Sequence, residues 1–105
     1  MQAKRYADAL FFCHLTLEAL LKAAVVAKTG EYPPHQHDLV DLARRASVVL
    51  DEKKTKELAE ITTFNIRARY DDYKLSFYRK ATKEYAASYV AITSQLRTWI
   101  RNAFQ

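Results

Sequence analysis

Hydrophobic residues recur every three or four positions along residues 3–29, which is the spacing of one face of an α-helix. This series is Tyr6, Leu10, Cys13, Leu17, Leu20 and Ala24. Phe11, Phe12, Leu15, Leu21, Val25 and Val26 add apolar surface to the other side of the same helix. A helix that is apolar on most sides is central in its bundle or covered by a partner. We therefore expect residues 3–29 to form the central helix of the fold.

The rest of the chain shows shorter helical patterns separated by turn and capping signals. Gly30 predicts the end of the first helix, and Pro33 and Pro34 exclude helix from the connection that follows. Three further helices are predicted at about 38–50, 51–63 and 83–104, and residues 64–74 are expected to be irregular or a broken helix. Residues 75–80 are expected to form one helical turn or two. The predicted N-caps are His37 or Asp38, Asp51 and Thr82.

The same pattern predicts which side chains of these later helices point inward. In the second helix they are Leu39, Leu42, Ala43, Ala46 and Val49. In the third they are Leu58, Ile61 and Thr62. In the last they are Tyr85, Tyr89, Ile92, Leu96, Trp99 and Ile100.

Length and composition restrict the fold class. The 105 residues suffice for one domain, residues 1–105, and the apolar fraction of 50% argues against disorder. One Gly and two Pro leave few turn-formers, while the abundant Ala, Leu, Lys, Glu and Arg favour helix. We expect an all-α fold, an antiparallel up-down bundle of four main helices.

Cysteine usage and hydropathy bear on the cellular location. A single Cys13 excludes an intrachain disulfide, which fits a reducing compartment, and its apolar neighbours indicate a buried, inert thiol. No run of 18 uncharged apolar residues occurs, and the first residues do not resemble a signal peptide. The sequence therefore predicts a cytoplasmic protein without a membrane partner.

Positive charge is concentrated between residues 66 and 83. This stretch holds six cations and two acids, or +4 of the formal net charge of +5, with aromatic residues between them. Arginine donors suit phosphate, and an adjacent tyrosine can stack on a base. The candidate ligand-binding residues are Arg67, Arg69, Tyr70, Tyr73 and Lys74. The alternative is a solvated loop whose aromatic side chains pack onto the bundle, with Arg69 paired to Asp71, Asp72 or a helix carboxylate.

His14, Glu18 and Lys22 lie four residues apart and form one polar line on the first helix. One interpretation is the floor of a ligand pocket facing Arg67 and Arg69, which adds Glu18 and Lys22 to the candidate residues. The other is a buried pair whose charges satisfy each other.

Metal and cofactor chemistry find little support in the sequence. His35 and His37 stand in a proline-bounded loop without cysteines or an acidic partner set, so no metal site is expected. A single Gly excludes a glycine-rich phosphate loop or a dinucleotide-binding motif, so no cofactor is expected.

Several segments resemble HEPN domains, a family of small helical bundles. The matching features are Glu18 with Leu21-Lys22-Ala23, the Pro33-Pro34 connection, and His37-Asp38-Leu39. Further along, Asn65, Ala68, Arg69 and Tyr70 resemble the family's Asn-x-x-Ala-Arg-Tyr segment, and residues 97–100 fit its closing segment. The order and spacing of these motifs carry the resemblance, which spans nearly the whole chain.

The resemblance implies a function and also shows two departures from the family. HEPN domains usually carry another helix before the first one, and this sequence starts too late to contain it. Either that helix is absent, or a neighbouring subunit covers the exposed face, or the gene start is misassigned. Homodimerisation is expected to cover the apolar face of the first helix. HEPN ribonucleases share an Arg followed after four to six residues by a His, and this chain has no His beyond His37. Catalytic residues are therefore not assigned, since no imidazole follows an arginine at this spacing.

The family resemblance implies a non-catalytic module that binds a nucleotide or single-stranded RNA. Such modules work beside a minimal nucleotidyltransferase, in toxin–antitoxin or nucleotide-handling systems. Two alternatives remain open: a HEPN ribonuclease with an atypical catalytic group, and a pure protein-interaction module whose basic segment meets an acidic partner.

Overall fold

The computed structural model describes residues 2–33, 38–65 and 71–104, and these contain helices and no strand. The helices are α1 (Gln2–Thr29), α2 (Leu39–Arg45), α3 (Glu52–Thr62), α4 (Asp71–Lys80) and α5 (Lys83–Phe104). The predicted all-α bundle is confirmed. The helix beyond the four main helices predicted is α4. It begins at residue 71, four residues before the helical turn or two predicted at residues 75–80.

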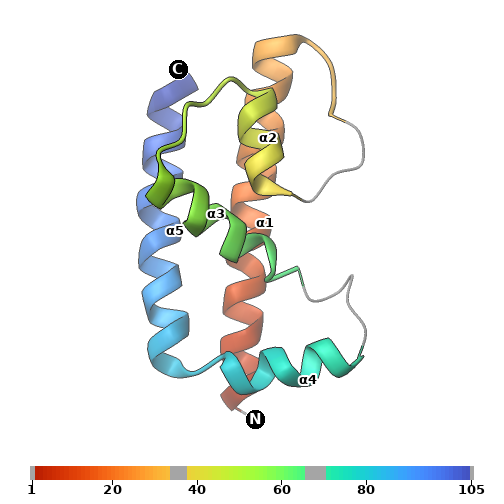
Figure 1. The fold of residues 1–105 in the computed structure, drawn as a ribbon, viewed down its shortest axis with the longest axis vertical. Helices are drawn as coiled ribbons and strands as arrows, with labels where there is room; N and C mark the ends of the chain where they lie inside the picture. Colours follow the sequence, from red (N-terminus) through yellow and green to blue (C-terminus); the bar gives the residue numbers. More distant parts are fainter. Residues whose placement is uncertain (1, 34–37, 66–70, 105) are drawn as a thin grey trace.

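The two long helices α1 and α5 lie side by side along the long axis of the molecule and form its spine, the pair on which the shorter helices pack (Figure 1). The molecule measures 42 × 25 × 20 Å. Neighbouring helices do not simply alternate in direction, because α1 and α5 both run from the lower to the upper end of Figure 1. The shorter α2 packs on α1 near its upper end. Helix α3 crosses the spine obliquely, and α4 lies across its lower end, where it leads into α5 (Figure 1).

The helix ends agree with the predicted capping residues. Asp38 accepts hydrogen bonds from the backbone N–H groups of Val40 and Asp41 at the start of α2, and Asp51 accepts one from Lys54 at the start of α3. Thr82 Oγ1 accepts from the N–H of Tyr85 at 3.1 Å. Gly30 has a φ of +76°, the left-handed conformation that ends many helices.

Helix α2 is shorter than predicted, and this changes which side chains are inward. It ends at Arg45, and Ser47 then adopts a φ of +60°, which turns the chain out of the helical path. The N–H of Val48 closes the turn on the carbonyl of Ala43 at 2.9 Å. As a result Val48 is buried, and Val49, predicted to be inward, is 85% exposed.

The core lies along α1, on which the other four helices pack. Most positions of the predicted stripe on α1 are buried, and so are Leu96 and Ile100 of α5. Thr62 connects two helices, since its hydroxyl accepts from the N–H of Leu39 and donates to the carbonyl of Leu58. The side of α1 turned away from this core leaves Phe12 60% and Leu15 37% exposed.

Helix α1 is also long and apolar enough, between Arg5 and Thr29, to cross a membrane by length and composition. Core helices that stay inside a fold pass the same test, so the expectation that no helix spans a membrane stays a prediction. Half of the segment is buried inside the fold, as in the core helices of proteins that never enter a membrane. The ion pair of Glu18 and Lys22 lies in the middle of it.

Candidate functional site

The basic stretch of residues 66–83 includes the end of the connection from α3 to α4, here called the basic segment, together with α4 and Lys83. Three candidate residues, Arg67, Arg69 and Tyr70, lie in this segment and outside the described residues. The two ends of the segment are described. Before it, Phe64 is fully buried and Asn65 is 9% exposed. After it, Tyr73 and Lys74 are half-buried in the first turns of α4.

A hydrogen bond joins the two ends of this segment. The hydroxyl of Tyr73 donates to the backbone carbonyl of Thr63 at 2.9 Å, across ten residues of sequence. The Tyr73 ring also stacks on Phe77, with an interplanar angle of 13°. Tyr73 therefore has a structural role, because its hydrogen bond ties the start of α4 to Thr63 at the end of α3.

The segment starts and ends on an aromatic cluster that connects α3, α4 and α5. Phe64 is its centre, with ring centroids 5.7 Å from Phe77, 5.9 Å from Tyr85 and 5.2 Å from Tyr89. Aromatic pairs at such distances stabilise a core beyond the area they bury. The cluster confirms part of the alternative interpretation, in which aromatic residues of this region pack onto the bundle.

Lys80, one of the six cations counted in the sequence, is engaged in a contact that the sequence did not reveal. Its Nζ lies 2.6 Å from Oε2 of Glu60 on α3 and 5.2 Å from the centroid of the Tyr85 ring. Tyr85 donates a hydrogen bond to the same carboxylate oxygen. No local pattern indicates these pairings, because Glu60 is 20 residues from Lys80 and 25 from Tyr85.

These contacts shift the ionisation of both Glu60 and Tyr85. Partial burial works to raise the pKa of Glu60, but the hydrogen bonds from Lys80 and Tyr85 outweigh it, and the pKa lies below its ordinary value. Burial, followed by the hydrogen bond to Glu60, raises the pKa of Tyr85. The phenol therefore stays protonated and acts as a donor, which suits a structural role.

The predicted polar line on α1 forms a compact buried group. Lys22 Nζ is 2.7 Å from Oε2 of Glu18, and Nδ1 of His14 is 3.5 Å from Oε1 of the same carboxylate. His14 is fully buried and Glu18 is 7% exposed. The contacts agree with a pair whose charges satisfy each other, while the proposed facing of Glu18 toward Arg67 and Arg69 involves residues outside the described part.

Two further groups considered in the sequence are Cys13 and the histidines of the proline-bounded loop. Cys13 is buried, and burial raises the pKa of its thiol, as expected for an inert side chain. Within residues 2–33, 38–65 and 71–104 no group of three or more His, Cys, Asp or Glu side chains is arranged to hold a metal ion. His35 and His37 lie outside these ranges.

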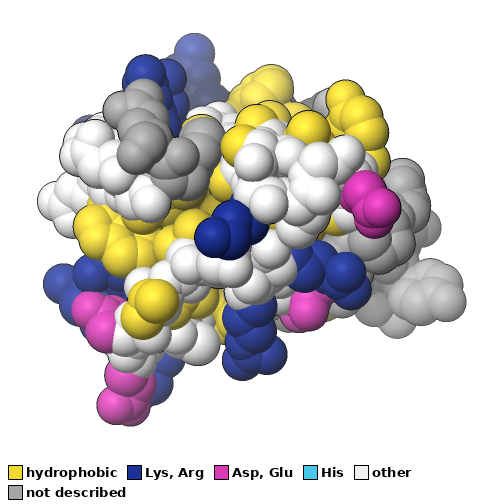
Figure 2. All heavy atoms as spheres, turned by 90° about the horizontal axis from the view of Figure 1, so that it is seen from above, with side chains coloured by type: hydrophobic (Ala, Val, Ile, Leu, Met, Phe, Trp, Pro, Cys, Tyr) yellow, Lys and Arg dark blue, Asp and Glu magenta, His cyan; other side chains and the backbone are white. Residues whose placement is uncertain are grey.

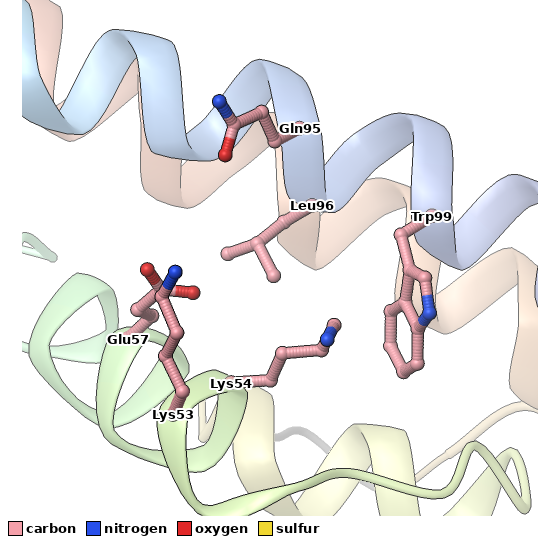
Figure 3. Close-up of a pocket in the computed structure, with 6 residues that line it drawn as sticks. All are labelled: Lys53, Lys54, Glu57, Gln95, Leu96 and Trp99. Atoms are coloured by element: carbon pink, nitrogen blue, oxygen red, sulfur yellow. The ribbon is translucent and has the colours of Figure 1, made fainter.

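A shallow cleft between α3 and α5, which the sequence did not predict, contains an aromatic ring and two lysines (Figure 3). It has a volume of about 160 Å³. Its lining residues are Lys53, Lys54, Glu57, Gln95, Leu96 and Trp99. Trp99 belongs to the predicted inward stripe of α5 but is only half-buried, with Lys54 Nζ lying 4.8 Å from the centroid of its ring.

Positive charge is also spread over the end of the bundle that Figure 2 shows. Lys and Arg side chains surround that face, with hydrophobic side chains between them, and they do not merge into one patch. Charge alone therefore does not locate a ligand on this face. The concentration of cations in residues 66–83 remains the clearest indication of a site for an anionic ligand.

The family of the chain follows from comparison with known families, because the HEPN domain model matches residues 1–103. The chain belongs to the HEPN family. This confirms the resemblance carried by Glu18, Pro33-Pro34 and the Asn65–Tyr70 segment. No significant match was found among curated proteins or among solved structures.

Proposed function

We propose that this HEPN domain binds a nucleotide or single-stranded RNA, without cleaving it, through the segment that joins α3 to α4. The observation that carries the proposal is the charge of residues 66–83, six cations against two acids with tyrosines between them. Two of the cations, Arg67 and Arg69, lie in the connection itself, and the other four lie on α4 and at the start of α5. Single-stranded nucleic acids are bound by this combination of basic groups for the phosphates and aromatic rings for the bases. Arg67, Arg69, Tyr70 and Lys74 are the proposed contacts.

The contacts at the ends of the segment support this role. The hydrogen bond from Tyr73 to Thr63 and the burial of Phe64 hold both ends on one aromatic cluster. A binding loop whose ends are held loses less conformational entropy when a ligand orders it. Lys80 is excluded from the proposed contacts because it is paired with Glu60.

The absence of cleavage is proposed from the sequence of the segment. No His follows His37 anywhere in the chain, so the Arg-x(4–6)-His arrangement of HEPN ribonucleases has no imidazole here. Tyr and Asp, which take the corresponding places, have ordinary pKa values near 10 and 4, far from that of a general acid–base group at neutral pH.

The family also suggests a setting for this activity. HEPN domains are known for ribonuclease and nucleotide-related roles and for toxin–antitoxin systems. We propose that this chain acts in such a system beside a minimal nucleotidyltransferase, in the cytoplasm, and that two copies associate through the exposed face of α1 that carries Phe12 and Leu15. Exposed apolar patches of this kind are usual at interfaces.

The experiment is a fluorescence-anisotropy titration of labelled single-stranded RNA at several salt concentrations, with a gel to detect cleavage. It compares the wild type with Arg67→Ala/Arg69→Ala. The matched control is Arg44→Ala/Arg101→Ala, which removes the same charge from two exposed positions on α2 and α5. We expect the segment variant to bind at least about tenfold more weakly, with a smaller salt dependence, and the control to bind nearly as the wild type does.

Three results would change the proposal. Absence of binding at moderate salt would overturn it. RNA cleavage that disappears in the Arg67→Ala/Arg69→Ala variant would favour the ribonuclease alternative. Binding that free nucleotides do not compete for, but an acidic protein does, would favour the protein-interaction module.

A further inference from the structure

We propose a second nucleotide subsite in the cleft between α3 and α5, where a base stacks on Trp99 and its phosphate pairs with Lys53 and Lys54 (Figure 3). This subsite is separate from the basic segment. Lys53 and Lys54 lie in the first turn of α3, whereas the basic segment follows its last residue, Thr62. Eleven helical residues span about 16 Å, so one base cannot reach both places.

The aromatic half of the subsite is the Trp99 ring. In Figure 3 the indole stands at one side of the cleft and Leu96 forms part of its wall. The ring is half-buried, so α5 holds it in place while part of its surface remains open. Over this ring lies the ammonium group of Lys54, whose Nζ is 4.8 Å from the ring centroid. It occupies the place of a packed side chain. A flat, open aromatic surface of this kind is what base stacking requires.

The charged half of the subsite favours an anionic ligand. The lining contains two lysines, Lys53 and Lys54, and one acid, Glu57, while a second acid, Asp51, pairs with Lys54 from outside the lining. A cationic ligand would also be attracted to an indole ring, but here it would meet two ammonium groups. An aromatic ligand that carries a phosphate satisfies both the ring and the lysines, and a nucleotide is such a ligand.

Lys54 can exchange its present contacts for a contact with a phosphate. Its Nζ is shared between the Trp99 ring and Oδ2 of Asp51, which lies 3.1 Å away. The lysine stem has several rotatable bonds, and its ammonium can pair with a phosphate from many directions. An entering base therefore displaces Lys54 from the ring, and the ammonium turns to the phosphate beside the base. The amide of Gln95 and the carboxylate of Glu57, both in the lining, are then available to the edge of the base or to the ribose.

The size of the cleft indicates how much of the ligand it holds. Its volume of about 160 Å³ is smaller than the roughly 300–1,000 Å³ of typical small-molecule pockets. It can accept one planar ring, while the sugar and phosphate stay at the rim. Affinity for a free mononucleotide should therefore be weak, and the source of the ligand is either a free nucleotide or one nucleotide of an RNA strand.

Trp99 is the only tryptophan of the chain, so its intrinsic fluorescence reports on this cleft alone. We would titrate the full chain with AMP, adenosine and inorganic phosphate and follow Trp99 emission. The test variant is Lys53→Met/Lys54→Met, which removes both charges but keeps most of the apolar stems. The control is Lys56→Met, an exposed lysine of the same helix that pairs with Glu52 outside the cleft. Thermal melts would show that each variant is folded.

We expect AMP to quench Trp99 saturably and to bind about tenfold more tightly than adenosine, because only AMP reaches the lysines. In Lys53→Met/Lys54→Met the two ligands should bind equally, and Lys56→Met should retain the wild-type difference. Absence of quenching by AMP up to millimolar concentrations would overturn the proposal. An equal affinity for AMP and adenosine in the wild type, or quenching by inorganic phosphate alone, would overturn it as well.

A second arm distinguishes the two sources and separates this inference from the proposed function. Pentaadenylate that quenches Trp99 at lower concentration than AMP would identify RNA as the source, and equal concentrations would identify a free nucleotide. The Arg67→Ala/Arg69→Ala variant should keep the full AMP response, because the cleft lies at the other end of α3. Loss of the AMP response in that variant would contradict a separate subsite.

Discussion

Tyr85 of α5 donates a hydrogen bond to the carboxylate of Glu60 on α3, 25 residues earlier in the chain. Lys80, the last residue of α4, pairs with the same carboxylate oxygen. One acidic side chain thus connects the three helices between which the basic segment begins and ends. We expect this contact to stabilise the fold around the candidate site, and its contribution to the free energy of unfolding can be measured.

Removing the phenol oxygen should weaken the fold measurably. In Tyr85→Phe the ring stays in its cluster, but Glu60 loses one donor, and we expect the free energy of unfolding to fall by about 1 kcal/mol. The measurement is urea denaturation followed by circular dichroism. Tyr32→Phe, at a position that is 85% exposed, is the control and should change little. Equal effects of the two substitutions would show that the contact with Glu60 contributes nothing.

Glu60 should also make stability depend on acid pH. Its pKa in the folded protein lies below the ordinary value of 4.5, so near that pH the unfolded chain binds more protons than the folded one. The stabilisation is therefore complete above about pH 4.5 and is lost as the pH falls through the folded pKa. Unfolding free energies measured from pH 3 to pH 7 should fall less steeply on acidification in Glu60→Gln than in the wild type. Parallel curves would contradict a lowered pKa.

The aromatic cluster should contribute far more than any one ion pair. Phe64 is fully buried and contacts three aromatic rings, so Phe64→Ala should reduce the free energy of unfolding by about 3–5 kcal/mol. Denaturant titration of the variant is the direct test. If the variant does not fold, Phe64→Leu provides a milder change that should still be clearly destabilising. A loss as small as that from an exposed position would mean that Phe64 is not at the centre of the cluster.

The exposed face of α1 should be the place where two copies meet. Phe12→Glu places a charge on this face and should weaken self-association at least tenfold, because a buried unpaired charge is costly. Sedimentation equilibrium of the wild type and the variant measures this directly. Val49→Glu introduces the same charge at an apolar residue that is 85% exposed elsewhere, and should leave association unchanged. A wild type that is monomeric at the highest soluble concentration would refute the proposed dimer.

Much of the fold could be predicted from the sequence because its signals are local. The apolar spacing of residues 3–29 and 83–104 predicted α1 and α5, and Asp38, Asp51, Thr82 and Gly30 marked helix ends. Each cap acts on backbone groups within a few residues of itself, so its effect can be read without the rest of the fold. The motifs around Glu18 and Asn65 likewise indicated the family that the domain match confirmed.

The prediction failed at Val49 and placed the start of α4 four residues too late, and both errors have a physical reason. A helical period continued through Ser47 makes Val49 inward, but the left-handed backbone of Ser47 breaks that period and buries Val48 instead. Residues 71–74 carry two acids and a lysine, and their helix is stabilised because Phe77 packs on Phe64 and Tyr73 stacks on Phe77. Local composition does not contain that packing.

Helices α1, α3 and α5, the capping residues, the family and the concentration of charge in residues 66–83 follow from local signals in the sequence. Which side chains meet across the bundle is set by the tertiary structure. It decided that Glu60 binds Lys80 and Tyr85, that Tyr73 holds the ends of the basic segment together, and that Lys54 covers Trp99. These contacts join residues 10 to 45 positions apart, and their partners are set by how the helices cross, which depends on the packing of the whole core.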